Sequence, residues 1–318
     1  MDRAQEEEEQ MAEAGSGEFD HRRLVSSLDA EQRRMLTSLT DGPGLRQLFA
    51  HLGLIVLLGV LIGKAVPGWP LLLLPQGILI VFLFTALHET SHNTAFRTRW
   101  LNTAVAHLAG FLILVPPCWF KYFHFAHHRH THDPDHDPEL MSPKPETLWQ
   151  YARYLSGLPL WWSMLRTLVA NARGAITDPF LPKGARPQMV LEARAMLAAY
   201  VLLLLGSLLV GSTLLLWTWL VPVVLGQPLL RAYLLAEHAR CSHVANMLEN
   251  TRTTFTTRIV RFLAWNMPYH AEHHAFPTVP FHRLPALHEH ARAHLRQTER
   301  GYARFNGKFA KAVAGGRA

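Results

Sequence analysis

Histidine is the residue type in this sequence with the clearest chemical potential, because three groups of histidines have a regular spacing. The first group, residues 88–92, reads HETSH, and its i, i+4 spacing places two imidazoles on one face of a helix. The second group, residues 124–128, and the third, residues 270–274, both read HxxHH. Imidazole is a ligand for zinc, copper, iron and nickel. Two HxxHH groups together with an HxxxH group therefore predict a metal site.

A ninth histidine extends this set. His238 ends the last apolar stretch of the chain, within Ala236-Glu237-His238. A lone histidine at the end of a span is more often hydrogen-bonded than metal-bound, but the three groups favour a ligand here. Nine imidazoles divide into sets of four and five that leave positions for oxygen or water, so two metal ions are expected. The predicted metal ligands and catalytic residues are His88, His92, His124, His127, His128, His238, His270, His273 and His274.

Metal-bound histidines need their second ring nitrogen held by a carboxylate or a carbonyl. Acidic residues close to the groups in sequence are predicted to do this: Glu89, Glu237, Glu272 and the series Asp133, Asp135, Asp137 and Glu139. Asn266 is a candidate to hold a metal-bound water, with a structural hydrogen bond as the alternative. His130, His132 and His136 leave the second group ambiguous, because His128 and His132 are also spaced i, i+4. The remaining histidines are interpreted as packing or surface residues.

The elements that position these histidines are predicted to be membrane helices. Of the 318 residues, 49% are hydrophobic and 17% charged, and residues 69–87 and 195–230 contain no charged side chain. A spanning helix needs about 20 apolar residues. We expect an all-α integral membrane protein with four transmembrane helices in two hairpins and a cytoplasmic, histidine-rich helical cap that holds a di-metal site. The four spans are predicted at about 48–66, 69–87, 195–211 and 213–236.

A fifth apolar segment, residues 104–120, contains His107 and ends at Pro116-Pro117. It is too short for a standard span, so we predict an interfacial or re-entrant segment, and a true span is the alternative. Charge is scarce in the loops inside each hairpin, whereas the N-terminal, central and C-terminal segments are rich in arginine. The positive-inside rule therefore places both termini and the site in the cytoplasm, and a bacterial inner membrane is expected.

The chain is predicted to divide into three parts. Residues 1–47 form a cytoplasmic leader, with 1–20 disordered, residues 48–285 form the membrane domain, and residues 286–318 form a basic cytoplasmic tail. The tail is predicted to dock an acidic electron donor, with contact to anionic lipid as the alternative. Nucleic acid is not an expected partner, and two cysteines exclude a disulfide scaffold.

The sequences HETSH, HFAHH and HAEHH, placed after paired hydrophobic hairpins, resemble the histidine boxes of the membrane fatty acid desaturase and hydroxylase superfamily. The resemblance covers roughly residues 48–285, and residues 88–96 and 269–277 are similar to the first and third boxes of sphingolipid Δ4-desaturases. It implies two iron ions on the nine histidines, O₂ as oxidant, and a lipid or fatty acyl substrate that is desaturated. The Glu-His context of His238 also resembles the isolated histidine of membrane alkane hydroxylases.

The sequence departs from the resemblance in two respects. Its first box has three intervening residues, whereas acyl-CoA Δ9-desaturases typically have four, which disfavours that substrate class. It also contains neither a cytochrome b5-like haem motif nor rubredoxin-like CxxC pairs, which implies a separate donor, either ferredoxin, rubredoxin or a cytochrome b5-like protein with its reductase.

Other functions remain open at this point. The same site in the superfamily also supports hydroxylation, ketolation and decarboxylation. Residues 88–92 match the HExxH motif of membrane zinc proteases, which would leave both HxxHH groups unexplained. A transporter that buffers metal ions in residues 124–136 is a further alternative, although the predicted spans contain few groups that could form an ion path.

Overall fold

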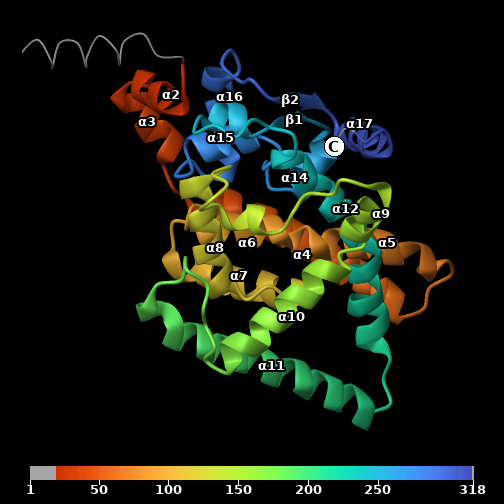
Figure 1. The fold of residues 1–318 in the computed structure, drawn as a ribbon. Coiled ribbons are helices and arrows are strands. Elements are labelled where there is room, and N and C mark those ends of the chain that lie inside the picture. Colours follow the sequence, from red (N-terminus) through yellow and green to blue (C-terminus); the bar gives the residue numbers. More distant parts are fainter. Residues whose placement is uncertain (1–18, 317–318) are drawn as a thin grey trace, which may run out of the picture.

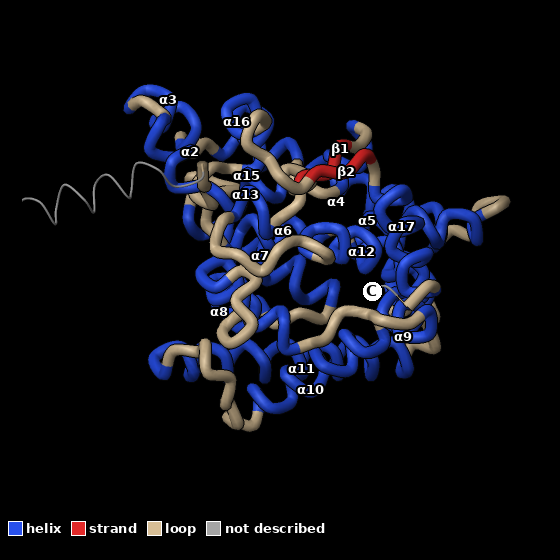
Figure 2. The backbone as a smooth tube through the Cα atoms, turned by 45° about the horizontal axis from the view of Figure 1, so that its top comes forward, coloured by secondary structure: helices blue, strands red, loops and turns tan. Residues whose placement is uncertain are grey.

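The structure, a computed structural model, describes residues 19–316 and is mostly helical in that range (Figure 1). Its α-helices are α2 (His21–Ser27), α3 (Ala30–Thr37), α4 (Asp41–Gly63), α5 (Leu73–Val81), α6 (Leu83–Ser91), α7 (Arg99–Ile113), α8 (Pro117–His130), α9 (Leu148–Leu155), α10 (Leu158–Ala172), α11 (Arg186–Leu209), α12 (Val221–His238), α13 (Met247–Asn250), α14 (Arg258–Leu263), α15 (His270–Ala275), α16 (Leu284–Ala291) and α17 (Tyr302–Ala314). Two short strands, β1 (Thr253–Phe255) and β2 (Thr298–Arg300), pair in parallel (Figure 2).

Shorter helical turns connect several of these elements. They are η1 (Trp69–Leu72), η2 (Pro138–Met141), η3 (Lys183–Ala185), η4 (Leu216–Leu220) and η5 (Phe281–Arg283).

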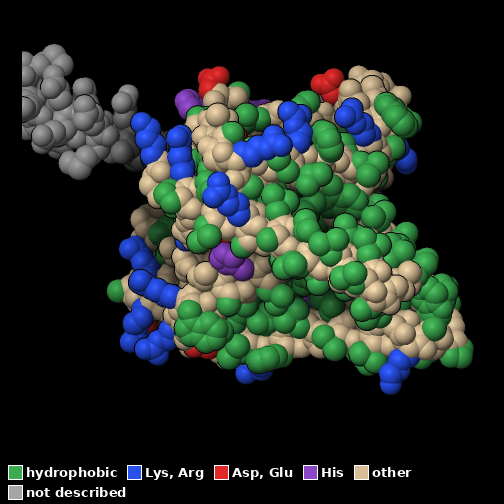
Figure 3. Space-filling view, turned by 90° about the horizontal axis from the view of Figure 1, so that it is seen from below, with side chains coloured by type: hydrophobic (Ala, Val, Ile, Leu, Met, Phe, Trp, Pro, Cys, Tyr) green, Lys and Arg blue, Asp and Glu red, His purple; other side chains and the backbone are tan. Residues whose placement is uncertain are grey.

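Four helical segments of the described chain are long and apolar enough to cross a membrane, as the sequence predicts. They are Ala30–Gly63, Trp69–Ser91, Lys183–Leu209 and Leu216–His238. Leucine and valine side chains on these helices face outward, such as Val56 on α4, which is 63% exposed, and Leu208 on α11, which is 68% exposed. Lipid chains are the solvent that such surfaces require. Figure 3 shows apolar side chains over much of one face of the molecule, with Lys and Arg gathered toward its edges.

The fifth apolar segment folds as two helices, α7 and α8, whose axes are bent by 99° at the break between them. Leu114 adopts a left-handed conformation at this break, with φ 62°, and Pro117 begins the next helix. The bend is tight enough that a side chain at Gly110 would lie 2.4 Å from the carbonyl oxygen of Val115. A bend of this size occurs both in a re-entrant segment and in a broken span, so the interfacial or re-entrant segment stays a prediction.

Helices α5 and α12 make the closest packing contact of the membrane region. A Cβ atom added to Gly77 would lie 1.8 Å from the carbonyl oxygen of Pro222, and one added to Gly226 would lie 2.3 Å from the carbonyl carbon of Gly77. Small residues at a helix interface allow backbones to approach in this way. The contact brings the end of α12, with His238, toward α6, which continues the same span as α5 and carries the first histidine group.

Helices α2, α3, α15 and α16, together with both strands, form a layer on the side of α4, α5 and α6 that lies opposite α10 and α11 (Figures 1 and 2). The predicted basic tail does not extend freely within the described residues, because β2 pairs with β1 through Thr253 and Thr298, and Phe305 and Phe309 of α17 pack on Tyr151. This packing could not be predicted from the sequence, because the segment contains few large apolar side chains. The predicted division of the chain into three parts stays a prediction.

The leader also packs within this layer, since Leu24 of α2 contacts Leu248 and Ala275. Between residues 21 and 47 the chain forms α2, α3 and the start of α4. Asp29 begins the second of these helices, because its side chain and that of Gln32 form a reciprocal capping box. The disorder predicted for residues 1–20 falls, apart from its last two residues, outside the described residues.

Candidate metal centre

The structure brings all nine predicted histidines together beneath the layer, where α6, α8, α12 and α15 meet. They form two groups. The first, called the five-histidine group here, has one ring nitrogen from each member within 4.8 Å of all the others and consists of His88, His92, His124, His128 and His273. The second contains His127, His238 and His274, which meet the same criterion, and His270, whose Nε2 lies 3.1 Å from Nε2 of His238. We call it the four-histidine group.

Helix geometry explains how each HxxHH group is shared between the two sets. Successive residues of an α-helix are about 100° apart, so positions i and i+4 lie about 40° from each other, while i+3 lies about 60° to the other side. In α8 the i and i+4 histidines, His124 and His128, join the five-histidine group and His127 joins the other. In α15 the assignment is reversed, because His273 joins the five-histidine group while His270 and His274 join the other. Each HxxHH group therefore contributes to both sets.

Buried ring nitrogens without partners indicate that a metal fits this arrangement. Both nitrogens of His88, His128 and His273 are buried and have no hydrogen-bond partner. Leaving such atoms unpaired costs about 1–3 kcal/mol each, and native proteins rarely do so. Nine converging imidazoles are a donor set that binds borderline metals. Metal ions would satisfy these nitrogens, whereas protein hydrogen bonds in the described structure do not.

Facing nitrogens have the separations expected of ligands to a common ion. The Nε2 atoms of His92 and His124 are 2.7 Å apart, and those of His127 and His238 are 3.2 Å apart. Two atoms that each lie about 2.1 Å from one ion are about 3–3.6 Å apart at ordinary coordination angles, and the His127–His238 pair falls in this range.

The buried imidazoles of α15 are held in the neutral form. Desolvation lowers the pKa of His270 to about 3 and holds the pKa values of His273 and His274 well below the ordinary range. Neutral imidazole is the form that binds a metal ion, because a protonated ring has no free lone pair. Burial therefore prepares these side chains for coordination.

In the four-histidine group, the Nδ1 atoms of three rings are held by hydrogen-bonding partners. His127 donates to Asp137 Oδ1 at 2.9 Å, and Asp137 is itself buried. His238 Nδ1 lies 3.3 Å from the carbonyl oxygen of Asn250. Hydrogen bonds of this kind fix the tautomer and leave Nε2 as the metal-facing atom.

Thr131 holds the third of these rings, and Glu237 lies beside the fourth. His274 Nδ1 lies 3.1 Å from Thr131 Oγ1, whose own hydrogen is donated to the carbonyl oxygen of His127 at 2.7 Å. His270 Nδ1 lies 3.5 Å from Glu237 Oε1. Asp137 and Glu237, two of the acids expected to support the metal site, are thus the carboxylates beside these rings, and their role stays a prediction. Thr131 and Asn250 had no sequence signal, because neither residue type nor spacing marks a partner that is brought in by tertiary structure.

Three other residues expected to support the metal site, Glu89, Asn266 and Glu272, contact groups other than the nine imidazoles. Glu89 Oε1 accepts the backbone N–H of Phe281 at 3.0 Å, and Asn266 Nδ2 donates to the carbonyl oxygen of the same residue at 3.2 Å. Glu272 accepts the hydroxyl of Thr253 at 2.6 Å and pairs with His288. These contacts tie the third histidine group and its neighbours to the rest of the layer. They match the structural alternative for Asn266.

Aromatic side chains line the spans next to the five-histidine group. Phe120 stacks on His124 with ring centroids 5.4 Å apart, and Phe84 packs edge-on against Phe120 at the same distance. Trp265, five residues before the third histidine group, is fully buried and lies 3.3 Å from His51 through its indole nitrogen. An apolar wall therefore adjoins the histidines on the side of α6 and α8.

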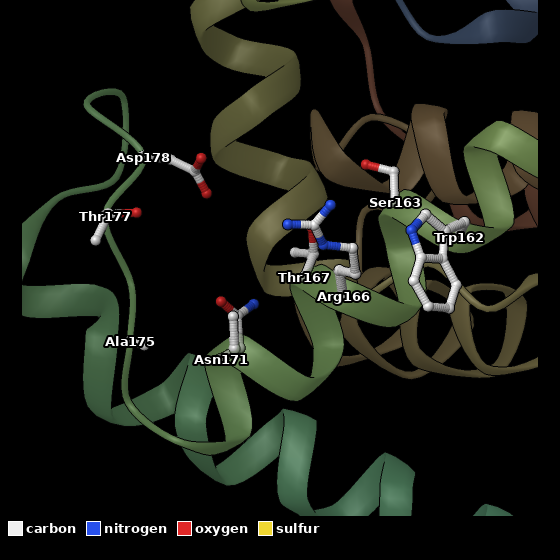
Figure 4. A pocket seen from close by; sticks show the side chains of 9 residues that line it. Trp162, Ser163, Arg166, Thr167, Asn171, Ala175, Thr177 and Asp178 are labelled. Atoms are coloured by element: carbon white, nitrogen blue, oxygen red, sulfur yellow. The ribbon is translucent and has the colours of Figure 1, made fainter.

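A separate polar cavity of about 320 Å³ lies between α10 and the segment that follows it (Figure 4). Arg166 and Asn171 project from α10, and Asp178 faces them from the segment. Asp178 also accepts the indole N–H of Trp119 at 2.9 Å. None of the nine histidines lines this cavity.

Comparison with known proteins identifies the class to which this site belongs. The sequence model of the fatty acid desaturase family matches residues 65–306, which include all nine histidines. The chain belongs to this family.

Individual relatives match at lower coverage. The chain is 26% identical to a Delta(12) fatty acid desaturase of Calendula officinalis over 69% of this chain and 65% of the relative. It is 31% identical to an sn-1 oleoyl-lipid 12-desaturase of a Picosynechococcus strain over 31% of each protein. It is also 31% identical to an sn-1 acyl-lipid omega-3 desaturase (ferredoxin) of a Nostoc strain, over 29% of this chain and 27% of the relative. The matched part thus spans less than a third of two of these relatives and about two thirds of the other.

Proposed function

We propose that this chain is an O₂-dependent membrane oxidoreductase that desaturates an acyl chain of a fatty acid or other lipid. The site consists of the nine histidines with two iron ions, and electrons come from a separate donor. The observation that carries the proposal is the pair of buried histidine groups whose ring nitrogens face one another, with both nitrogens of His88, His128 and His273 lacking a hydrogen-bond partner. Membership of the desaturase family and the acyl-lipid desaturases among the relatives support the same reaction class.

A redox metal is needed because removal of hydrogen from an unactivated methylene is beyond the reach of any side-chain base. When bound, the iron pair supplies the reduction of O₂ that generates an oxidant strong enough for this step. The chain's own residues orient the metal-binding imidazoles and exclude water from the site. Asp137, Asn250 and Thr131 fix three imidazoles of the four-histidine group, and the overlying layer removes the site from bulk water.

The acyl chain is proposed to reach the site from the membrane along the apolar wall of Phe84 and Phe120. Both side chains lie next to His88 and His124 of the five-histidine group. A lipid head group would then remain in the interface while the tail reaches the metal. The placement of one methylene decides between double-bond formation and hydroxylation, because a small displacement of the reacting carbon changes which step follows.

We further propose that the histidine groups and both termini face the cytoplasm of a bacterial inner membrane. The scarcity of charge in the loops inside both hairpins supports this orientation. The donor is proposed to be a ferredoxin, a rubredoxin or a cytochrome b5-like protein, and similarity to the sn-1 acyl-lipid omega-3 desaturase (ferredoxin) of Nostoc favours ferredoxin.

Elemental analysis of the purified, detergent-solubilised chain tests the metal assignment. We expect about two irons per chain, and a His270→Ala, His273→Ala double variant, which removes one ligand from each group, to lose most of both. His290→Ala is the matched control, because His290 is exposed and outside both groups. Expression of the wild type in a host of defined lipid composition should then give new alkenes among the membrane acyl chains.

Two outcomes would contradict the proposal. One zinc per chain that survives the double substitution but is lost on His92→Ala would favour a zinc protease. Metal binding without O₂ consumption in the presence of a reductant would favour metal transport or storage. New alcohols in place of alkenes would retain the iron site and change the reaction to hydroxylation.

A further inference from the structure

We propose that the carboxylate of Glu139 is a metal ligand in the four-histidine group, so that each of the two ions has five protein donors. The inference rests on the proposed function for the identity of the metal pair. Glu139 lies outside the regular histidine spacing. From the sequence it was expected only to hold an imidazole, like the other acids of its series.

The position of the carboxylate carries the argument. Glu139 Oε2 lies 3.4 Å from Nε2 of His127, the nitrogen that also lies 3.2 Å from Nε2 of His238. His238 in turn lies 3.1 Å from His270 through their Nε2 atoms. These are the separations expected of neighbouring ligands around one ion, about 3–3.6 Å for metal–ligand bonds near 2.1 Å. The oxygen thus continues the row of metal-facing nitrogens.

A second acid on the same ring shows that Glu139 does not serve to orient His127. Asp137 already accepts the Nδ1–H of that imidazole at 2.9 Å, so the orienting position is filled. Glu139 approaches the opposite nitrogen. With an ion bound at Nε2 the ring keeps a single N–H, which Asp137 accepts, so Glu139 then has no proton of this ring to accept. The carboxylate on the Nε2 side is therefore suited to share a cation with the ring.

The two histidine groups offer different numbers of donor atoms, and the carboxylate oxygen of Glu139 makes up the difference. The five-histidine group has five imidazole donors, whereas the other has four. Among the described residues, neither mutually close set of histidines includes a carboxylate within 4.8 Å of all its ligand atoms, so Glu139 would join the four-histidine group beside His127. Carboxylate oxygen binds iron alongside imidazole in non-haem iron sites. Addition of Glu139 makes the two donor counts equal and the two donor sets chemically different.

The local fold fixes the carboxylate in this position. Asp137 caps η2 by accepting the backbone N–H of Glu139 at 2.9 Å, and Pro138 begins that turn. Lys144 Nζ lies 2.6 Å from Oε1 of Glu139, which leaves Oε2 directed toward His127. The ammonium group thus engages one carboxylate oxygen and favours coordination through the other. The competing explanation is that Glu139 only pairs with Lys144.

The test uses the full-length chain loaded with ⁵⁷Fe in detergent, with iron content, the rate of iron removal by a chelator and the Mössbauer spectrum as readouts. Glu139→Gln keeps the size of the side chain and removes its charge. We expect one of two iron environments to change while the other is retained, and one iron per chain to be removed at least about tenfold faster. Glu146→Gln, which removes the same charge from an exposed position in the following segment, should match the wild type.

Two further variants separate coordination from ion pairing. Lys144→Gln breaks the pair but keeps the carboxylate, so we expect both iron environments to persist. Glu139→His replaces the oxygen with a nitrogen donor and should restore retention of the second iron without restoring the pair. If Glu139→Gln cannot be purified, Glu139→Asp gives the same readout, because it withdraws the carboxylate by one methylene.

The outcomes are distinct. Wild-type spectra and iron retention in Glu139→Gln, or equal defects in Glu139→Gln and Lys144→Gln, would overturn the role of Glu139 and leave the proposed function intact. Wild-type protein that binds no iron pair would instead contradict the proposed function.

Discussion

His127 donates its Nδ1–H to the buried carboxylate of Asp137 at 2.9 Å, and this hydrogen bond directs the other nitrogen of the ring toward His238. The second oxygen of Asp137 accepts the backbone N–H of His132 at 2.8 Å. One side chain therefore fixes both the imidazole and the turn that ends α8. Asp137 is the point at which the fold of the loop and the geometry of the site depend on each other.

Asp137→Asn should weaken metal binding by the four-histidine group. An amide accepts less strongly than a carboxylate and can present its NH₂ to the ring, which no longer stabilises the required tautomer. Loss of an orienting partner costs about 10–100-fold in metal affinity, so one iron per chain should become easy to remove with a chelator while the other remains. Asp135→Asn is the control, since Asp135 is exposed in the same loop. Equal retention of iron in the two variants would contradict this role.

Single substitutions within one HxxHH group should affect different ions. His124→Ala removes a ligand from the five-histidine group, and His127→Ala, three residues later, removes one from the other. In ⁵⁷Fe-loaded protein we expect each variant to alter a different iron signal and both to abolish desaturation. Wild-type iron content and spectra in His136→Ala, an exposed histidine of the following loop, would show that the effect is specific to the two groups. The division is wrong if both variants change the same signal.

The spans and the nine histidines could be predicted because each depends on local pattern. Apolar runs of sufficient length define membrane helices, and i, i+3 and i+4 spacing places imidazoles together on a helix. The sequence also indicated two sets of four and five ligands. Which histidine joins which set could not be predicted, because it depends on how α8 and α15 are rotated against each other. Only tertiary packing fixes that rotation.

Supporting residues were predicted only where they lie near the histidines in sequence. Asp137 and Glu237 lie beside the rings, whereas Glu89 and Glu272 contact Phe281 and His288. Asn250 reaches His238 across a turn that leaves no signal in residue type or spacing. The C-terminal segment was predicted as a tail because its charge is conspicuous, while the three apolar side chains that anchor α17 are spaced four residues apart and easily overlooked.

Gly77→Ala should destabilise the protein, because its Cβ would overlap the backbone of Pro222 on α12 and backbone cannot move aside as a flexible side chain can. We expect a cost of about 1–3 kcal/mol, seen as a lower thermal unfolding midpoint in detergent, together with weaker iron binding at His238. Gly206→Ala on α11 is the matched control, since nothing lies within 4 Å of its added Cβ. That variant should be neutral or up to about 1 kcal/mol more stable. An unchanged midpoint in Gly77→Ala would contradict the predicted close contact.

Basic side chains of the C-terminal segment form the proposed docking surface for an acidic electron donor. The sequence singled out Arg283, Arg292, Arg296, Arg300, Arg304, Lys308 and Lys311. Within this set, Arg304 and Lys308 also pair with the buried carboxylate of Glu299, at 3.5 and 2.5 Å. Their removal would leave that charge unpaired, so a docking test should spare them.

The double variant Arg300→Gln, Lys311→Gln removes two exposed cations and leaves the Glu299 pairs in place. We expect donor-supported turnover to fall about three- to tenfold at low salt and the difference to shrink as salt rises, because screening weakens long-range attraction in both proteins. Turnover with a small uncharged reductant should be unchanged, since no protein surface is involved. Lys64→Gln, on the loop predicted to face the opposite side of the membrane, should match the wild type in both assays. An equal loss with the donor and with the small reductant would point to damage at the site and count against docking.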